Sequence, residues 1–194
     1  MEGLPSAAGY GIIRQSHISV GVKIVVQDRR VYLLAQFDAA TELRLTGIYG
    51  ELARAGCIGQ QTPGVPYHFT MGSFPVERAS GVLERAREVC RSTDAFGINL
   101  SHIGLFGLKV LFIGPSMNGE LLGLHNALVP EEPATGHHDW VAHATLLMDE
   151  PDIIHMAIPV VARHFEPFSA RVESVGIYEF FPARFIENCP LTSG

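Results

Sequence analysis

Apolar and polar positions alternate along the chain in two distinguishable ways, at the spacing of strands and at the spacing of helices. Residues 18–26 and 31–37 are rich in β-branched and aromatic side chains on either side of a polar segment, QDRR, which predicts two strands. From Thr41, a candidate helix N-cap, apolar residues recur at helical spacing until Gly56, a candidate helix end. The elements predicted farther along are strands at 67–74, 96–106, 108–114, 140–147 and 168–180 and helices at 76–93, 118–128 and 151–165.

The order strand, helix, strand, helix, strand occurs twice in this prediction. The segments FGINLSHIGLF and FSARVESVGIY, which close the two series, share apolar residues at matching positions and a glycine, Gly104 in one and Gly176 in the other. Each follows a His-x-Thr tripeptide at a similar distance. We therefore predict a duplicated supersecondary unit, with the two tripeptides at equivalent places in two halves of one domain.

Composition predicts a single folded domain over residues 1–194, with residues 1–30 its less certain part. Of the 194 residues, 47% are hydrophobic and 18% are charged, which is a globular profile. The formal net charge of -6 argues against a broad grip on duplex nucleic acid, because such binding requires a basic face. We expect any phosphate ligand to be held locally.

Cysteines and apolar runs predict the cellular setting. The three cysteines form no Cys-x-x-Cys pair and are odd in number, which argues against a disulfide framework and a cysteine metal site and favours a cytoplasmic location. The first residues lack the basic and apolar pattern of a secretory signal, and the apolar runs are shorter than the roughly 20 residues of a membrane span. We expect no association with a membrane.

The two tripeptides each place a histidine and a threonine on one face of a strand. Residues i and i+2 of a strand point the same way, so His68 lies beside Thr70, and His143 lies beside Thr145. His17 in SHISVG is a near-match, but it precedes the first repeated element, and a polar strand position is its simpler explanation. The simplest alternative for the two pairs is that both histidines are hydrogen-bonded strand residues without chemistry.

A cleft that brings both pairs together suits a phosphodiester. One neutral imidazole, with an ordinary pKa of about 6.5, accepts a proton from water or a ribose hydroxyl, and a protonated one donates to the departing oxygen. Threonine hydroxyls donate to the non-bridging oxygens, and neither a metal ion nor a cofactor is required. The same alternation puts Leu147 on the face of His143 and Thr145, and leaves Ala144 and Leu146 for the opposite face.

These residues resemble a known family. HFTM at His68 and HATL at His143, each between helices in a repeated α/β unit, resemble the paired His-x-Thr signature of the two-histidine phosphoesterase superfamily, and most closely its 2'-5' RNA ligase-like and cyclic phosphodiesterase members. The similarity runs from about Val31 to about Phe181. It implies an α/β fold of the α+β kind, with two lobes of β-α-β-α-β type related by pseudo-twofold symmetry around a central cleft.

The resemblance also implies an activity. His68 and His143 would be the general acid and base, with either order open, and Thr70 and Thr145 would bind phosphate. The implied enzyme is a metal-independent hydrolase that cleaves a 2',3'-cyclic or 2'-5'-linked ribose phosphate, reversible as RNA 2'-5' ligation and serving RNA processing. A noncatalytic module that binds nucleotides or RNA ends in the same cleft is the alternative. We expect a monomer whose partner is a small cyclic nucleotide or an RNA end.

One departure from the family concerns the second motif. Some members carry Arg or Lys shortly after it, whereas this chain has Met148 followed by two acidic residues. The difference favours a small cyclic phosphate over a long polyanion as substrate. Basic help would come from arginines such as Arg29, Arg30 and Arg184.

Two features near the second motif carry weaker signals. GHHDW places His137 and His138 beside Asp139, but adjacent histidines on an extended chain point to opposite faces and no spaced third ligand follows. A loop is therefore favoured over a metal site. Trp140 would stack on a base at the cleft mouth or, as is commoner for a lone tryptophan at a strand start, pack at an edge.

Overall fold

A computed structural model describes residues 29–60, 62, 64–130 and 140–193 of the chain. The strand predicted at 18–26, His17 and the cluster of His137, His138 and Asp139 lie outside these residues. The elements are β1 (Arg30–Phe37), α1 (Ala39–Arg54), β2 (His68–Pro75), the short helix η1 (Val76–Arg78), α2 (Ala79–Arg91), β3 (Phe96–Phe106), β4 (Val110–Ser116), α3 (Gly119–Leu128), β5 (Ala144–Met148), α4 (Pro151–His164), β6 (Phe168–Phe180) and β7 (Arg184–Pro190).

The strands form one antiparallel sheet in the order β2-β1-β6-β3-β4-β5, and β7 pairs with residues 174–179 of β6, beyond the part that β3 covers. This order is symmetric. If β1 is exchanged with β4, β2 with β5 and β3 with β6, the same order results, read from the other end. The last strand of each predicted unit therefore lies against the first strand of the other, and the two His-x-Thr segments occupy opposite ends of this path. The mixed α/β class is confirmed, whereas a duplication in sequence stays a prediction.

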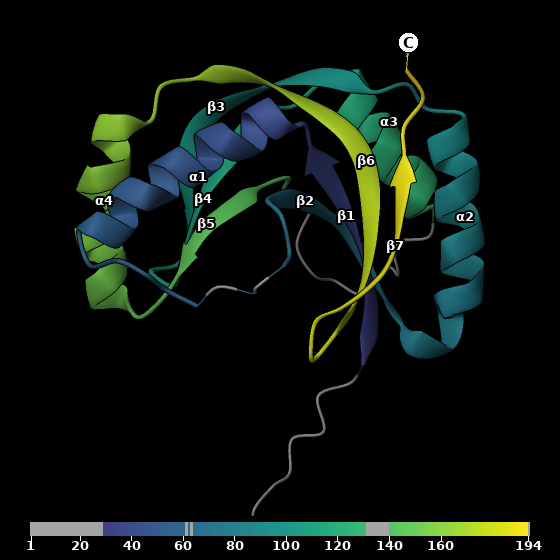
Figure 1. Cartoon of the computed structure of the whole chain (residues 1–194), viewed down its shortest axis with the longest axis horizontal. Coiled ribbons are helices and arrows are strands. Elements are labelled where there is room, and N and C mark those ends of the chain that lie inside the picture. The colour runs from purple at the N-terminus through teal and green to yellow at the C-terminus, as the bar shows by residue number, and fades with distance from the viewer. Residues whose placement is uncertain (1–28, 61, 63, 131–139, 194) are drawn as a thin grey trace, which may run out of the picture.

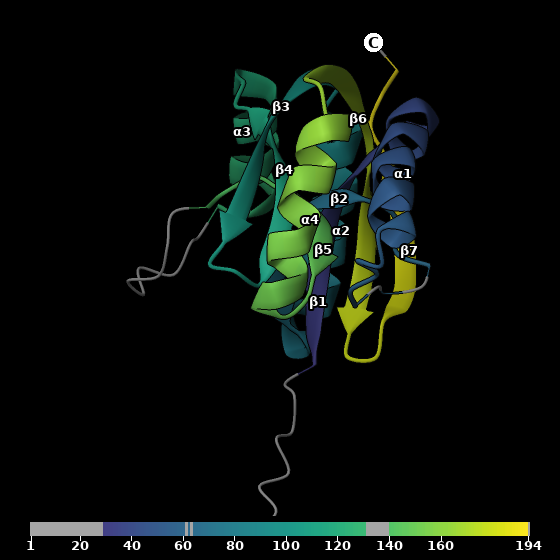
Figure 2. The same ribbon diagram turned by 90° about the vertical axis from the view of Figure 1, so that its left-hand side faces the viewer.

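Four helices flank the sheet in two pairs. Figure 1 shows α1 and α4 on one side of the curved sheet and α2 and α3 on the other, and the members of each pair contact one another. Figure 2 shows α1 and α4 again side by side after a quarter turn. In one pair, α1 follows the first strand of one predicted unit and α4 follows the motif segment of the other. In the second pair, α3 and α2 have the same relation. Among the described helices, none is both long enough and apolar enough to cross a membrane.

Helix α1 begins earlier than the sequence predicts. Its N-cap is Asp38, whose carboxylate accepts a hydrogen bond from the Thr41 amide at 2.9 Å, so Thr41 lies inside the first turn and is buried. Helix α3 begins as predicted, because Asn118 caps it by accepting from the Leu121 amide at 3.0 Å. Helix α4 begins with Pro151, at the position where a missing N–H costs nothing.

Two predictions for the strands are corrected. The strand predicted at 140–147 begins only at Ala144, because the carbonyl of Val141 binds the ring of His143 rather than a neighbouring strand. Strand β7 has no counterpart among the predicted elements. Its residues are mostly exposed and carry charges, so they show no apolar alternation, and only their pairing with β6 makes them a strand.

Candidate active site

The register of β1 and β2 places the first motif on the inner face of the sheet. His68 is paired with Gln36 and Thr70 with Leu34, while Phe69 between them is fully buried in the core on the opposite face. His68 and Thr70 are half-buried. The strand alternation therefore places one imidazole and one hydroxyl side by side, as the sequence predicts.

The second motif straddles the start of β5. His143 precedes the strand, and Thr145 is paired with Phe112 on β4. Leu147 is fully buried but lines the same cavity as Thr145, and Leu146, which was predicted for the opposite face, lines it too. The register shifts between Leu111 and Phe112, and this bulge interrupts the simple alternation that the prediction assumed.

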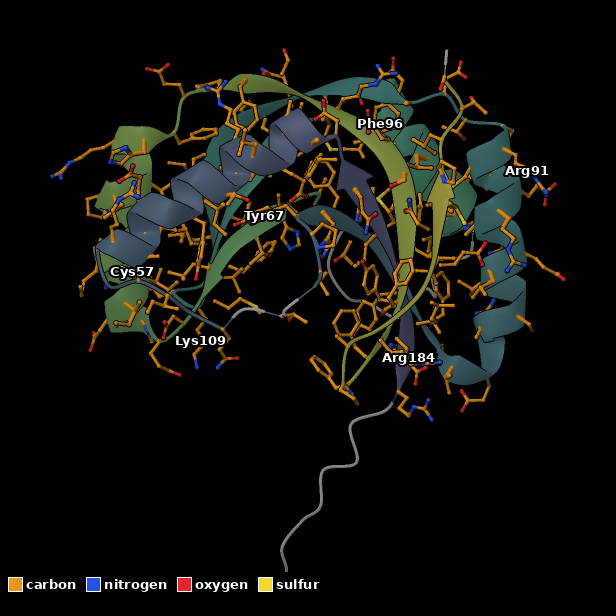
Figure 3. All side chains as sticks on the ribbon, in the orientation of Figure 1. Cys57, Tyr67, Arg91, Phe96, Lys109 and Arg184 are labelled. Carbon is orange, nitrogen blue, oxygen red and sulfur yellow. The ribbon has the colours of Figure 1, made fainter. Side chains whose placement is uncertain are left out.

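Three of the four predicted residues line one cavity. His68, Thr70 and Thr145 border a space of about 650 Å³, within the range of roughly 300 to 1,000 Å³ that is usual for ligand pockets. The other described lining residues are Tyr32, Leu34, Glu42, Thr46, Gln60, Thr62, Val65, Pro66, Tyr67, Leu146, Leu147, Met148, Phe180 and Phe181. Figure 3 shows one of them, Tyr67, beneath α1 in the middle of the molecule.

His143 is not part of the lining of this cavity. Its ring lies against two aromatic rings, with centroids 4.7 Å from Phe106 and 5.2 Å from Phe112. It is nevertheless close enough to His68 for a charge on it to lower the pKa of the His68 ring. The fold thus brings the two predicted histidines into electrostatic contact from opposite ends of the sheet path.

The two imidazoles are held by the same local contact. Nδ1 of His68 lies 2.7 Å from the carbonyl oxygen of Pro66, and Nδ1 of His143 lies 2.7 Å from that of Val141. A carbonyl oxygen only accepts, so each Nδ1 must carry the proton. The tautomer that follows leaves Nε2 of both rings as the nitrogen that exchanges protons.

The pKa of His68 is lowered from its ordinary value. Burial is the main cause because it disfavours the charged ring, and a charge on His143 acts in the same direction. The hydrogen bond to Pro66 opposes both effects. His68 is therefore neutral, with Nε2 able to accept a proton, over the physiological pH range.

The cavity also contains a carboxyl group that the sequence does not single out. Glu42, in the first turn of α1, has its pKa raised to about 7 by burial, against an opposing effect of the Tyr67 backbone amide. Its Oε1 atom is buried and has no hydrogen-bond partner among the described residues. Burial and Glu42 together raise the pKa of the Tyr67 hydroxyl. A glutamate at the start of a helix usually complements the helix dipole, so sequence pattern offers no signal for this position.

Trp140 connects the two motif segments instead of presenting a free face. Its indole stacks on the His125 ring of α3, with centroids 3.9 Å apart and planes 21° apart, and its Nε1 donates to the Thr70 carbonyl at 2.9 Å. The packing interpretation of Trp140 is therefore favoured over base stacking. The contact fixes the segment that carries His143 to the strand that carries His68.

The three arginines that the sequence suggested as basic residues for the phosphate instead bind other groups of the protein. Arg29 and Arg184 both form ion pairs with the buried carboxylate of Glu179, whose pKa they lower. Arg30 donates to the carbonyl of Ser73 at 2.8 Å. Figure 3 shows Arg184 at the lower end of the β6–β7 hairpin. None of the three arginines lines the cavity.

Comparisons with known proteins now identify the family. A family model described as the 2'-5' RNA ligase superfamily matches residues 34–180, which include both motifs and the cavity walls from Leu34 to Phe180. The chain belongs to the 2'-5' RNA ligase superfamily. Comparison with curated proteins finds no match.

Solved structures agree with the superfamily fold. The chain is similar to E. coli LigT in its apo form, with a TM-score of 0.58 and 16% identity over 85% of this chain and 98% of that chain. For E. coli LigT complexed with 3'-AMP, the TM-score is 0.59 and the identity is 16%, over 85% of this chain and 99% of that chain. For the protein TT0787 of Thermus thermophilus, the TM-score is 0.56 and the identity is 16%, over 84% of this chain and 98% of that chain. At this identity the likeness shows the fold alone.

Side chains that could bind a metal ion do not cluster in the described part of the chain. No group of three His, Cys, Asp or Glu residues that could hold an ion occurs there. Cys57, Cys90 and Cys189 are buried free thiols, and the thiols of Cys90 and Cys189 lie within hydrogen-bond reach of each other. The candidate site comprises His68, Thr70, Thr145 and Glu42 on the cavity lining, with His143 close enough to affect the pKa of His68.

Proposed function

We propose that the protein is a phosphodiesterase that cleaves a 2',3'-cyclic or 2'-5'-linked ribose phosphate by acid-base catalysis between His68 and His143. The observation that carries the proposal is the matched tautomer of the two rings, each with Nδ1 bound to a carbonyl and Nε2 left to exchange protons. Superfamily membership supports phosphoesterase chemistry in general. The substrate and the roles of individual residues are our inference.

His68 is the better general base. Burial lowers its pKa, so its ring is neutral at the pH where the enzyme works, and it borders the cavity directly. In the hydrolysis of a 2',3'-cyclic phosphate, Nε2 of His68 takes a proton from water as the water oxygen forms its bond to phosphorus. His143, in its protonated form, gives a proton to the ribose oxygen as the bond from that oxygen to phosphorus breaks. In ligation a 5'-hydroxyl group takes the place of water: His68 accepts its proton as the oxygen bonds to phosphorus, and His143 protonates the 3' oxygen as its bond to phosphorus breaks.

Thr70 and Thr145 supply hydroxyl donors for the phosphate. They border the cavity from opposite ends of the sheet path, which allows the phosphate to lie between them. Hydrogen bonds to a charged acceptor are stronger than those between neutral groups, at about 1.5 to 3 kcal/mol. The two threonines therefore hold the singly charged phosphodiester through neutral hydroxyl donors.

The rest of the cavity accommodates a nucleoside. Tyr32, Phe180 and Phe181 line it, and the Tyr32 and Phe180 rings meet edge to face at 5.0 Å. Aromatic side chains accept a base by stacking without selecting its sequence. The three arginines turned toward protein partners add no extended basic track, so a small cyclic phosphate or a single RNA end suits this cavity better than a long strand.

A substrate panel tests the proposal. The purified protein is assayed with 2',3'-cyclic nucleotides, ADP-ribose cyclic phosphate and 2'-5' dinucleotides in the presence of EDTA, alongside His68→Ala, His143→Ala and a matched control, His155→Ala. His155 is exposed on α4 and outside the cavity lining. We expect turnover by the wild type and the control alone. Full activity of either motif variant would refute the acid-base pair.

A noncatalytic binding module is the second candidate. It is favoured by one observation, namely that His143 lies outside the cavity lining and packs against two phenylalanines. In that case calorimetry would show that a 3'-nucleotide binds, while no member of the panel would be turned over.

A further inference from the structure

Glu42 is a titratable group on the cavity lining that the proposed chemistry does not use. It lies one helical turn before Thr46 on α1, and both side chains border the same space as His68. Tyr67, the residue before His68, contacts Glu42 through its backbone amide. The carboxyl group therefore stands beside the catalytic end of the cavity.

The hydrogen-bonding capacity of Glu42 is only partly used by the protein. Oε1 has no partner within the described residues, and no ion pair found among them includes this carboxyl group. A buried polar atom without a partner costs about 1 to 3 kcal/mol. Because its burial also raises its pKa to about 7, both its neutral and its ionised forms are present near neutral pH.

A ligand in the cavity changes this balance. It displaces water from the walls, so the carboxyl group must then bind either a protein group or the ligand. Among the described neighbours the Tyr67 amide binds the carboxyl group, and the hydroxyls of Tyr67 and Tyr178 lie close enough for its charge to raise their pKa. The missing partner is a donor, and a nucleoside carries donors of two kinds, namely N–H groups on the base and hydroxyl groups on the sugar.

We propose that Glu42 is a specificity-determining residue whose carboxyl group accepts a hydrogen bond from an N–H or O–H donor of the nucleoside that carries the phosphodiester. The inference rests on the proposed function, because it takes the substrate to be a nucleoside phosphate. A site built around a buried acceptor discriminates strongly against analogues that lack the matching donor, since the acceptor is then left unpaired.

The two possible sources of the donor are separated by two pairs of substrates. A nucleoside 2',3'-cyclic phosphate has one free sugar hydroxyl, at the 5' position, so comparison with its 5'-deoxy analogue tests the sugar. Guanosine and inosine 2',3'-cyclic phosphates differ in one amino group, and the adenosine and purine-riboside compounds differ in another, so these comparisons test the base. For the wild type, we expect either the sugar comparison or one of the base comparisons to show a kcat/KM about tenfold or more higher for the substrate that carries the donor.

Two variants of Glu42 and one control variant test whether Glu42 causes that preference. Glu42→Gln keeps an acceptor oxygen and should keep part of the preference. Glu42→Met keeps the length of the side chain without an acceptor and should reduce the ratio to near one, with a higher KM for the favoured substrate. Glu51→Met, on the same helix but ion-paired with Arg54 outside the cavity lining, should leave the ratio unchanged. Thermal melting confirms that each variant is folded.

The outcomes separate this inference from the proposed function. A wild-type ratio near one in both arms, or an equal ratio in the wild type and Glu42→Met, overturns the role of Glu42 while leaving catalysis intact. If no substrate is turned over, the proposed function fails, and calorimetry with the 3'-monophosphates of guanosine, inosine, adenosine and purine riboside and with their 5'-deoxy analogues replaces the kinetic ratio. Equal affinities in the wild type and Glu42→Met, or no binding at all, then overturn the inference as well.

Discussion

His68 and His143 are held in the same way, since each ring binds through Nδ1, at 2.7 Å, to the carbonyl oxygen two residues earlier in the chain. The contact is local and needs no third side chain, so each short motif orients its own ring. The remaining environment differs, because His68 borders the cavity and His143 packs against Phe106 and Phe112. Equal tautomers in unequal surroundings suit a pair in which one ring accepts a proton and the other donates one.

Removal of either imidazole should abolish turnover with little effect on folding. General acid and general base catalysis each contribute about 10²- to 10⁴-fold, so His68→Ala and His143→Ala should each lower kcat by at least about a hundredfold. His68→Asn retains a side-chain donor for the Pro66 carbonyl but no base, and should be as inactive as alanine. Steady-state kinetics and circular dichroism check both points. Activity within threefold of wild type in His68→Asn would argue against proton transfer by this ring.

Loss of a threonine hydroxyl should weaken phosphate binding more than it slows the chemical step. A hydrogen bond to a charged acceptor is worth about 1.5 to 3 kcal/mol, so Thr70→Val and Thr145→Val should each raise KM by about ten- to a hundredfold. Thr→Ser at the same positions keeps the hydroxyl and should restore most of the affinity. If Val and Ser variants have the same KM, the hydroxyl groups do not bind the phosphate.

The lowered pKa of His68 predicts the acidic limb of the pH profile. Its ring must be neutral to accept a proton, and burial favours the neutral form, so kcat/KM should begin to fall only below pH about 6.5. Measurement of kcat/KM from pH 4.5 to 9 checks this assignment. An acidic limb centred above pH 7 would contradict His68 as the base.

Much of this site could be predicted from strand alternation alone. Period-two spacing places His68 with Thr70 and buries Phe69, and the register with β1 confirms this arrangement. The same rule misplaces Leu146, which lines the cavity with Thr145 and Leu147, because a bulge in the pairing of β4 and β5 depends on the partner strand and leaves no mark in the sequence. Local periodicity describes a strand only as far as its pairing stays regular.

Features that depend on tertiary packing could not be predicted. RFIENCP shows no apolar alternation, so β7 forms only because β6 offers it a free edge. Glu42 has the ordinary position of an acidic residue in a first helical turn, and its burial beside Tyr67 comes from the way α1 lies over the cavity. Trp140 likewise became informative only when its partners, Thr70 and His125, were known.

Trp140→Phe should loosen the connection between the two motifs. Phenylalanine preserves the stack on His125 and removes the Nε1–H that donates to the Thr70 carbonyl, at a cost of about 1 kcal/mol in the free energy of unfolding. We expect a small fall in melting temperature together with a several-fold fall in kcat, because Thr70 and the segment before His143 lose their common anchor. A variant with lower stability and unchanged kcat would show that the contact is structural only.

The carboxyl group of Glu42 should make the stability of the protein depend on pH. Its pKa is raised from 4.5 to about 7 in the folded state, so between these values the folded protein binds more protons than the unfolded chain does. The free energy of unfolding therefore falls as pH rises through this window, and the loss is complete above pH about 7. Solvent screens this partly exposed group, so we expect a contribution of about 1 kcal/mol.

Glu42→Gln isolates this effect because glutamine does not titrate. Relative to wild type, the variant should gain melting temperature as pH rises from 5 to about 7 and change little above that, while the effects of His68 and of other groups cancel in the difference. Glu120→Gln, at an exposed position in the first turn of α3, is the matched control and should show no such trend. Thermal denaturation of the three proteins at half-unit pH intervals provides the measurement. A difference between Glu42→Gln and wild type that stays constant with pH would mean that Glu42 ionises as an ordinary exposed carboxylate.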